Sequence, residues 1–305
     1  ANNLPRINYS GFTYDGSGDI IPNSGCGAWL FEPQSTNRRN YSQDFSVDYN
    51  VTKAVITSNA ITAPDGTVTG TIFADDDSGG TFAVQLFKGA PVEVSSTYTF
   101  SAFVKKKDND YIILRTSSYT TPINSNSYFD LELGTIVSEA AAHTARIENY
   151  GNGWYRCSIT FTSGASDTTG NCTLRLSEDG ITSVVPVDGT NSVYVWGWQF
   201  EKQSYPTSYI PTSGSIVTRN QDLCTNGGDA SLINSTEGVL YVEASFEEDA
   251  PSSLARISIS DGSVQNRVLL FKSTTNKSIG AIVSSGNASQ FNTSFVYTGS
   301  ADDFF

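Results

Sequence analysis

Short runs that alternate apolar and polar residues dominate the chain from about residue 80 onward, and this pattern limits the fold more than any other feature. Side chains alternate between the two faces of a β-strand, so a period of two predicts strands with one buried face. Each run is short and is bounded by Gly, Asn, Asp or Ser residues, which are typical of turns. The predicted inward sets are Phe82, Val84 and Leu86; Tyr98, Phe100, Ala102 and Val104; Phe129, Leu131 and Leu133; Tyr155, Cys157, Ile159 and Phe161. We therefore predict an all-β fold, with antiparallel strands packed as a sandwich. Residues 138–150 fit either a helical turn or an extended connection.

The pattern divides the chain into four parts. Residues 1–40 are rich in Gly, Asn and Pro and are predicted to be an extended N-terminal arm, residues 41–218 one β-sandwich, and residues 219–235 a linker. Residues 236–305 begin a second all-β unit with few candidate strands for a closed sheet. We expect this second unit to be truncated or to be completed by something else.

Charge and hydropathy exclude several classes of protein. The chain has 305 residues and a net charge of −13, and its only basic cluster is Lys105–Lys107, which we interpret as a solvated strand end. A nucleic-acid partner is therefore not expected. No apolar run reaches the ~20 residues of a transmembrane helix, and the N-terminus lacks the layout of a signal peptide. The chain contains no Met, so we expect its coding sequence to start upstream of Ala1.

Four cysteines, Cys26, Cys157, Cys172 and Cys224, show no metal-binding spacing. If the strands around Cys157 and Cys172 form a direct hairpin, the two sulfurs lie about 13 Å apart, too far for a disulfide. We therefore expect buried free thiols, compatible with synthesis in a reducing cytosol.

Several segments together resemble a family of bacteriophage virion-associated proteins. They are, in order, "WLFEPQSTNRRNYSQDF", "ITAPDGT", "YTFSAFVK", "SYFDLELGTIV", "IENYGNGWYRCSITFT" and "VYVWGWQFEKQSYPTSYIPTSGSIVTR". The resemblance covers most of residues 28–218. It implies a jelly roll similar to carbohydrate-binding modules of the galactose-binding type, followed from Thr236 by a concanavalin/laminin-G-like sandwich. Two departures stand out: Arg38-Arg39 replaces an apolar pair, and Trp198 replaces a small residue.

The aromatic row of residues 193–200 has two interpretations. A strict alternation places Tyr194, Trp196, Trp198 and Phe200 on one face, and such a row is typical of a core strand. The alternative is an exposed platform on which a sugar ring stacks. In that alternative Trp198 is the member to leave the core, because it is larger than the residue that it replaces. We predict that most of the row is core, and for Trp198 both interpretations stay open.

Other aromatic residues are weaker candidates for glycan binding. Trp154 and Arg156 share a strand face and are interpreted either as a stacked strand-edge pair or as a glycan contact. Tyr111 and Tyr119 flank a loop rich in Ser, Thr and Asn, a composition that suits sugar hydroxyls and also any long sandwich loop. The candidate glycan-binding residues are thus Trp198, Trp154, Arg156, Tyr119 and Tyr111.

Little in the sequence indicates a metal or a catalytic site. Asp75, Asp76 and Asp77 are weak candidates for a structural Ca²⁺, as in similar jelly rolls, but consecutive carboxylates on a strand point to opposite faces. We interpret them as a solvated hairpin tip. The single histidine, His143, is expected at the surface, and no nucleophile motif accompanies it. No catalytic residue and no cofactor are predicted.

We therefore expect a non-enzymatic structural or adhesion component of a phage particle: a tail fibre, tail-associated or head-decoration protein. It would be made in the host cytoplasm and act in the virion, with a host-surface glycan and other virion proteins as partners. We expect a homo-oligomer with strand or arm exchange between subunits. A fragment of a carbohydrate-active enzyme and a purely structural subunit without a ligand remain the alternatives.

Overall fold

A computed structural model describes residues 31–222, 239–240, 242, 255–261, 263–273 and 278–296, together with four short strands before residue 31. These parts of the chain contain strands and turns and no helix, so the all-β class is confirmed. Consequently no helix in the described residues is long and apolar enough to cross a membrane. The chain divides into two compact units, Ala1–Thr225 and Asn226–Phe305, and each is described by itself below.

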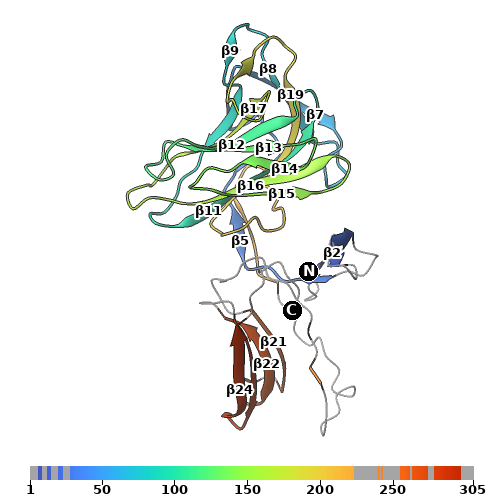
Figure 1. Cartoon of the computed structure of the whole chain (residues 1–305), viewed down its shortest axis with the longest axis vertical. Coiled ribbons are helices and arrows are strands. Elements are labelled where there is room, and N and C mark those ends of the chain that lie inside the picture. Colours follow the sequence, from blue (N-terminus) through green and yellow to red (C-terminus); the bar gives the residue numbers. More distant parts are fainter. Residues whose placement is uncertain are drawn as a thin grey trace. The chain divides into compact units, whose positions relative to one another are not determined.

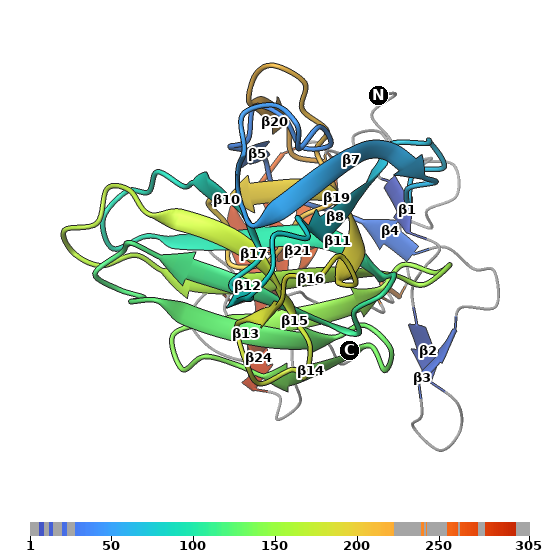
Figure 2. The ribbon, with the colours of Figure 1, turned by 90° about the horizontal axis from the view of Figure 1, so that it is seen from above.

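Two six-stranded antiparallel sheets form the sandwich of the first unit (Figures 1 and 2). The first sheet has the order β14-β13-β12-β17-β10-β6 and the second the order β15-β16-β11-β19-β8-β7. The strands of the first sheet are β6 (Asn50–Thr52), β10 (Gln85–Gly89), β12 (Tyr111–Ser117), β13 (Ser125–Asp130), β14 (Thr135–Ser138) and β17 (Asn171–Ser177). Those of the second are β7 (Ala54–Ile61), β8 (Gly70–Asp75), β11 (Thr97–Lys106), β15 (Thr144–Asn149), β16 (Trp154–Thr162) and β19 (Ser192–Glu201). The chain crosses repeatedly between the sheets, as in a jelly roll.

One apolar cluster fills the space between the sheets. Phe100, Val104 and Ile159 from the second sheet share it with Leu174 and Phe129 from the first, and all five are fully buried. The predicted inward sets of β11 and β16 are confirmed. Phe82 and Leu133 are exposed instead, because Phe82 belongs to the separate strand β9 (Thr81–Phe82), which pairs with β18 (Val185–Pro186), and Leu133 lies in the turn after β13. Residues 138–150 contain no helix: a turn at 141–142 leads into β15.

A β-bulge in β19 breaks the predicted alternation of its aromatic row. Ser101 of β11 pairs with Gln199, whereas Phe103 pairs with Trp196, so β19 holds one extra residue between these pairs. Gly197 has φ of +63° there, a conformation that favours glycine, and a Cβ at this position would lie 2.7 Å from the Phe103 ring. Beyond the bulge, Trp198 points into the interior, whereas Trp196 packs on the outer face with Phe103 and Trp154. The prediction that Tyr194, Trp196, Trp198 and Phe200 share one face is therefore wrong.

Cys157 and Cys172 are fully buried free thiols, as predicted. The hairpin assumed for them does not form, because β16 and β17 belong to different sheets. Burial raises the pKa of the Cys172 thiol to about 12, so it stays protonated at neutral pH. Cys26 and Cys224 lie outside the described residues.

The part of the chain predicted to be an arm contains short strand pairs. β1 (Arg6–Asn8) pairs with β4 (Ala28–Leu30), and β2 (Phe12–Tyr14) pairs with β3 (Ile20–Pro22). At the end of the predicted arm, β5 (Ser35–Asn37) pairs with β20 (Val217–Arg219) and contacts β19. This pair can be followed in Figure 2.

The described part of the second unit is one antiparallel sheet with the order β21-β22-β23-β24. Its strands are β21 (Ala255–Ser260), β22 (Arg267–Lys272), β23 (Ser278–Ser285) and β24 (Ala288–Val296). Most of residues 236–254, where the second unit is predicted to begin, lies outside the described residues. Ile257, Ile259 and Phe291 are among its exposed large apolar side chains, and every residue of β24 is exposed.

Candidate functional site

A buried layer of polar side chains covers the outer face of β19 next to its C-terminal end. Glu201 is fully buried, and its Oε1 accepts hydrogen bonds from the Ser35 hydroxyl at 2.6 Å and from the Thr207 hydroxyl. Its Oε2 accepts from Gln199 Nε2 at 2.7 Å and from the Thr207 backbone N–H at 3.1 Å. Burial raises the pKa of Glu201, and these donors oppose that shift. Glu201 therefore ties β5 and the loop after β19 to the sheet.

Asn37 and Gln199 complete this layer. Asn37 Nδ2 donates to the carbonyl oxygens of Trp198 (3.2 Å) and Ile210 (2.9 Å), while its Oδ1 accepts from the N–H of Phe200 at 3.2 Å. Gln199 Oε1 accepts from the Ile210 N–H at 2.7 Å. Two of the segments quoted in the sequence analysis, the one that contains Asn37 and the one that contains Gln199, Glu201 and Ile210, thus meet here and hold each other in place.

Because one face of β5 is hydrogen-bonded to β19 and the loop after it, the opposite face of β5 points outward. Ser35, Asn37 and Arg39 are buried, so the alternation of the strand turns Gln34, Thr36 and Arg38 the other way. These three residues line a surface pocket of about 450 Å³ together with Lys202, Gln203, Ile216 and Thr218. That volume lies within the ~300–1,000 Å³ of small-molecule sites.

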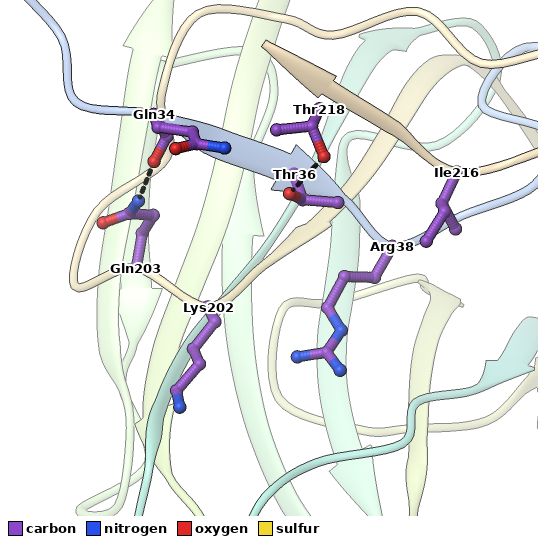
Figure 3. A pocket seen from close by; sticks show the side chains of 7 residues that line it. All are labelled: Gln34, Thr36, Arg38, Lys202, Gln203, Ile216 and Thr218. Carbon is purple, nitrogen blue, oxygen red and sulfur yellow. Dashed lines mark hydrogen bonds between the residues drawn. The ribbon is translucent and has the colours of Figure 1, made fainter. Parts of the chain in front are cut away.

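Figure 3 shows how the polar groups of this pocket lie. The hydroxyls of Thr36 on β5 and Thr218 on β20 share a hydrogen bond of 2.8 Å. Gln203 Nε2 donates to the Gln34 carbonyl oxygen at 3.0 Å. The cationic groups of Arg38 and Lys202 point to the same side of the pocket. The lining thus combines hydroxyl groups on β5 and β20 with amide and cationic groups that directly flank β5 and β19.

Glu93 bridges the two cations of the pocket. Lys202 Nζ donates to Glu93 Oε2 at 2.7 Å, and Arg38 Nη1 lies 3.7 Å from Glu93 Oε1. The Lys202 ammonium, and to a smaller extent the Arg38 guanidinium, lower the pKa of the Glu93 carboxyl. Glu93 therefore stays ionised at neutral pH, and the group carries one net positive charge.

The structure does not bring the predicted glycan-binding residues together on an exposed surface. Trp198, Trp154, Arg156 and Tyr119 are all buried, and Tyr111 is half-buried. Trp198 packs against Phe100 with ring centroids 4.5 Å apart, so of its two interpretations the core position holds and the exposed platform is wrong. The bulge at Gly197 is the reason, because it turns Trp198 inward.

Each of the other buried candidates has a structural partner. Trp154 Nε1 donates to the Thr62 carbonyl oxygen at 3.2 Å, and the Tyr119 hydroxyl donates to the Ala90 carbonyl oxygen at 2.7 Å. Arg156 Nη2 donates to the Ser101 hydroxyl at 3.1 Å, and its guanidinium lies 5.2 Å from the Phe103 ring centroid. A second pocket of about 180 Å³ adjoins Trp154 and includes Lys105 and Tyr150.

Asp75 organises a turn. It is buried, and it accepts backbone N–H bonds from Asp77 (3.0 Å), Gly189 (2.6 Å) and Asn191 (2.9 Å). Asp76 is half-buried and Asp77 is exposed, so the three carboxylates do not converge. Within the described residues, no group of three or more His, Cys, Asp or Glu side chains is arranged to hold a metal ion.

His143 is buried, so the prediction of a surface position is wrong. Its Nε2 lies 2.8 Å from the Thr116 hydroxyl and its Nδ1 lies 2.9 Å from the Ser127 hydroxyl. Burial lowers the pKa of His143 to about 4, so the ring is neutral at pH 7. Two hydroxyls saturate it, and it serves as a packed polar residue beside Phe161.

Sequence reasoning missed the pocket residues Gln34, Thr36 and Arg38. The signal that would have found them is the run "QSTNRR", in which polar residues occupy both faces of a three-residue strand and its flanks. A strand with two polar faces must bury one of them against hydrogen-bonding partners if it packs on a sheet. β19 and the loop after it supply those partners, because Glu201 accepts from Ser35 and the Ile210 carbonyl oxygen accepts from Asn37.

Comparisons with known proteins do not identify a family for this chain. No family model matches the chain, and no curated protein matches it. Among solved structures, the chain is similar to the enzymatically active domain of tailspike protein 4 from bacteriophage CBA120, with a TM-score of 0.33 and 10% sequence identity. The match covers 54% of this chain and 21% of that chain, so this chain spans about a fifth of that structure. A likeness of this size says nothing about activity.

Proposed function

We propose that the protein is a non-enzymatic structural and adhesive component of a bacteriophage particle, whose sandwich contacts saccharides at the host surface. The observation that carries the saccharide contact is the pocket over β5, since its volume and its lining suit a polyhydroxylated ring. Thr36, Thr218 and the Gln34 amide provide donors and acceptors for hydroxyls. Ile216 supplies an apolar contact for the C–H face of a sugar.

The way in which the pocket is built supports a binding role. Thr36 and Thr218 stand on β5 and β20, and the other lining residues directly flank β5, β19 or β20; β5 itself is held from behind through Asn37 and Glu201. Binding groups on rigid elements lose little conformational freedom when a ligand arrives. A single saccharide contact of this kind is weak, and many copies on one particle would raise the apparent affinity by avidity.

The place in a phage particle is supported by the ordered motifs in residues 28–218 and their structural role. Those motifs meet in the polar layer that fixes β5, so the resemblance concerns the part of the sandwich that carries the pocket. Exposed apolar residues on the four-stranded sheet of the second unit, such as Ile259 and Phe295, favour contacts between subunits in a homo-oligomer.

The test is to incubate the purified protein with surface polysaccharides of the host bacterium and to measure both binding and chain length. Binding with unchanged chain length supports the proposal. Shortened chains would favour a carbohydrate-active enzyme, and binding of no polysaccharide would favour a purely structural subunit. Analytical ultracentrifugation of the same sample tests the oligomer, and a monomer at all concentrations would contradict that part.

A further inference from the structure

We propose that the pocket over β5 selects a saccharide unit that carries a carboxylate, and that the carboxylate of Glu93 occupies the place of that group in the free protein. The inference rests on the proposed function, because it names the class of sugar that the same pocket takes. Arg38, Lys202 and Glu93 carry it.

The positions of these three groups describe a site for one carboxylate. The two oxygens of Glu93 face different cations, Oε2 facing Lys202 at 2.7 Å and Oε1 facing Arg38 at 3.7 Å. Two cations that share one carboxylate leave positive charge on the pocket side, although the chain as a whole has a net charge of −13. A protein with this net charge repels anions as a whole. An acidic sugar can therefore be attracted only by cations inside the pocket, such as Arg38 and Lys202.

Glu93 is suited to give way to a ligand. Its side chain is 59% exposed, and it lies between β10 and β11 rather than on a strand. The exposed ion pair with Lys202 contributes at most a small free energy in water. A sugar carboxylate that also gains hydrogen bonds from its ring hydroxyls can therefore replace Glu93.

Arg38 is held more firmly than Glu93. Its Nη1 donates to the Tyr98 hydroxyl at 3.2 Å, and its guanidinium lies 5.5 Å from the centroid of that ring. Tyr98 is itself fully buried and stacks on Phe200 with centroids 5.1 Å apart. Arg38 is thus a prepared cation that needs little reorganisation, and a planar guanidinium matches a carboxylate well.

The remaining lining residues would hold the sugar ring beside the acidic group. The Thr36–Thr218 hydroxyl pair and the Gln34 amide lie on the side of the pocket away from the cationic groups (Figure 3). One end of the pocket is therefore cationic and the other is neutral and polar. A uronate, in which one ring carries both a carboxylate and hydroxyls, has this same division.

The experiment uses the full chain and two matched probes, oligogalacturonate and its fully methyl-esterified form, with binding measured by calorimetry. We expect the acid to bind at least about tenfold more tightly than the ester, the effect of one charge-assisted contact. Arg38→Gln and Lys202→Gln each weaken binding of the acid by about tenfold and leave the ester unchanged. Glu93→Gln strengthens binding of the acid several-fold, because the competing carboxylate is removed.

Two controls separate recognition from folding. Lys107→Gln and Glu178→Gln make the same chemical changes as Lys202→Gln and Glu93→Gln, but outside the pocket, and neither is expected to alter the affinity for the acid. Thermal unfolding of every variant shows which of them keep the native fold. If Glu93→Gln lowers the affinity for the acid as much as Arg38→Gln does, Glu93 only supports the pocket and the inference is wrong. Equal affinity for acid and ester also overturns it while leaving the proposed function intact, whereas failure of host polysaccharides to bind removes the proposed function itself.

Discussion

The sheet that contains β19 is covered on both faces, and the two coverings differ in chemistry. On the inner face Trp198 and Phe200 join a cluster of apolar side chains between the two sheets. On the outer face Gln199 and Glu201 are just as fully buried, but beneath β5 and among hydrogen-bond partners. The inner layer is stabilised mainly by the apolar area that is removed from water, so it tolerates substitutions by apolar side chains of similar volume. The outer layer depends on each donor meeting its acceptor, so it fixes the position of β5 more sharply.

The largest effect is expected from emptying the inner layer. Trp198→Ala should lower the free energy of unfolding by about 3–5 kcal/mol, because it removes a fully buried ring that contacts Phe100 and leaves a cavity. Leu133→Ala, at a side chain that is 72% exposed, should change it by less than about 0.5 kcal/mol. Urea unfolding measures both. A small effect at Trp198 would mean that its ring lies outside the interior.

His143 is a polar side chain buried at the edge of the apolar interior, and its contribution to the free energy of unfolding depends on pH. Its folded pKa of about 4 lies below the ordinary value of 6.5, so its contribution to stability is present above pH 6.5 and is lost as the pH falls toward 4. A shift of this size corresponds to about 3 kcal/mol at most. In His143→Gln the loss of stability between pH 6.5 and 4 should shrink by about that amount, as measured by urea unfolding at each pH. An unchanged profile would show that the ring titrates normally.

Glu201→Gln probes the outer layer with almost no change in shape. Oε2 of Glu201 accepts from two N–H donors, so an amide nitrogen there would be left without an acceptor; in the place of Oε1 it would require the Ser35 and Thr207 hydroxyls to accept instead of donate, and in either place the charge of the acceptor is lost. We expect a loss of about 1–3 kcal/mol in the free energy of unfolding, together with weaker saccharide binding, because β5 carries part of the pocket. Glu178→Gln, the same change at an exposed carboxylate, is the control. Equal stability of the two variants would show that the outer layer does not require specific pairing.

The two layers also differ in how well the sequence predicts them. The interior follows from period-two alternation, which placed Phe100, Ile159 and Phe129 correctly. It failed at β19, where one glycine adds a residue to the strand and reverses the faces beyond it, and only strand pairing reveals that. The outer layer joins Asn37 to Trp198 and Ile210 across more than 160 positions of sequence, and no local pattern encodes such a pairing. The run "QSTNRR" marks Gln34, Thr36 and Arg38 as one face of a polar strand, but it does not show that Lys202 and Thr218 complete the pocket with them.

Arg39 combines features of both layers and gives the smallest expected effect. It is buried, its guanidinium lies 4.9 Å from the Phe200 ring centroid, and its Nη1 donates to the Gly89 carbonyl oxygen at 2.5 Å. Its Nε and Nη2 are buried without a hydrogen-bond partner, so the charge loses hydration that is not fully replaced. Arg39→Met keeps most of the volume and removes this cost, and we expect the free energy of unfolding to rise by about 1 kcal/mol in urea unfolding. Arg39→Ala should lower it, since the packed stem is lost as well. A destabilised Arg39→Met variant would mean that the bond to Gly89 and the ring contact outweigh desolvation, and that the interior, like the outer layer, depends on a specific polar contact.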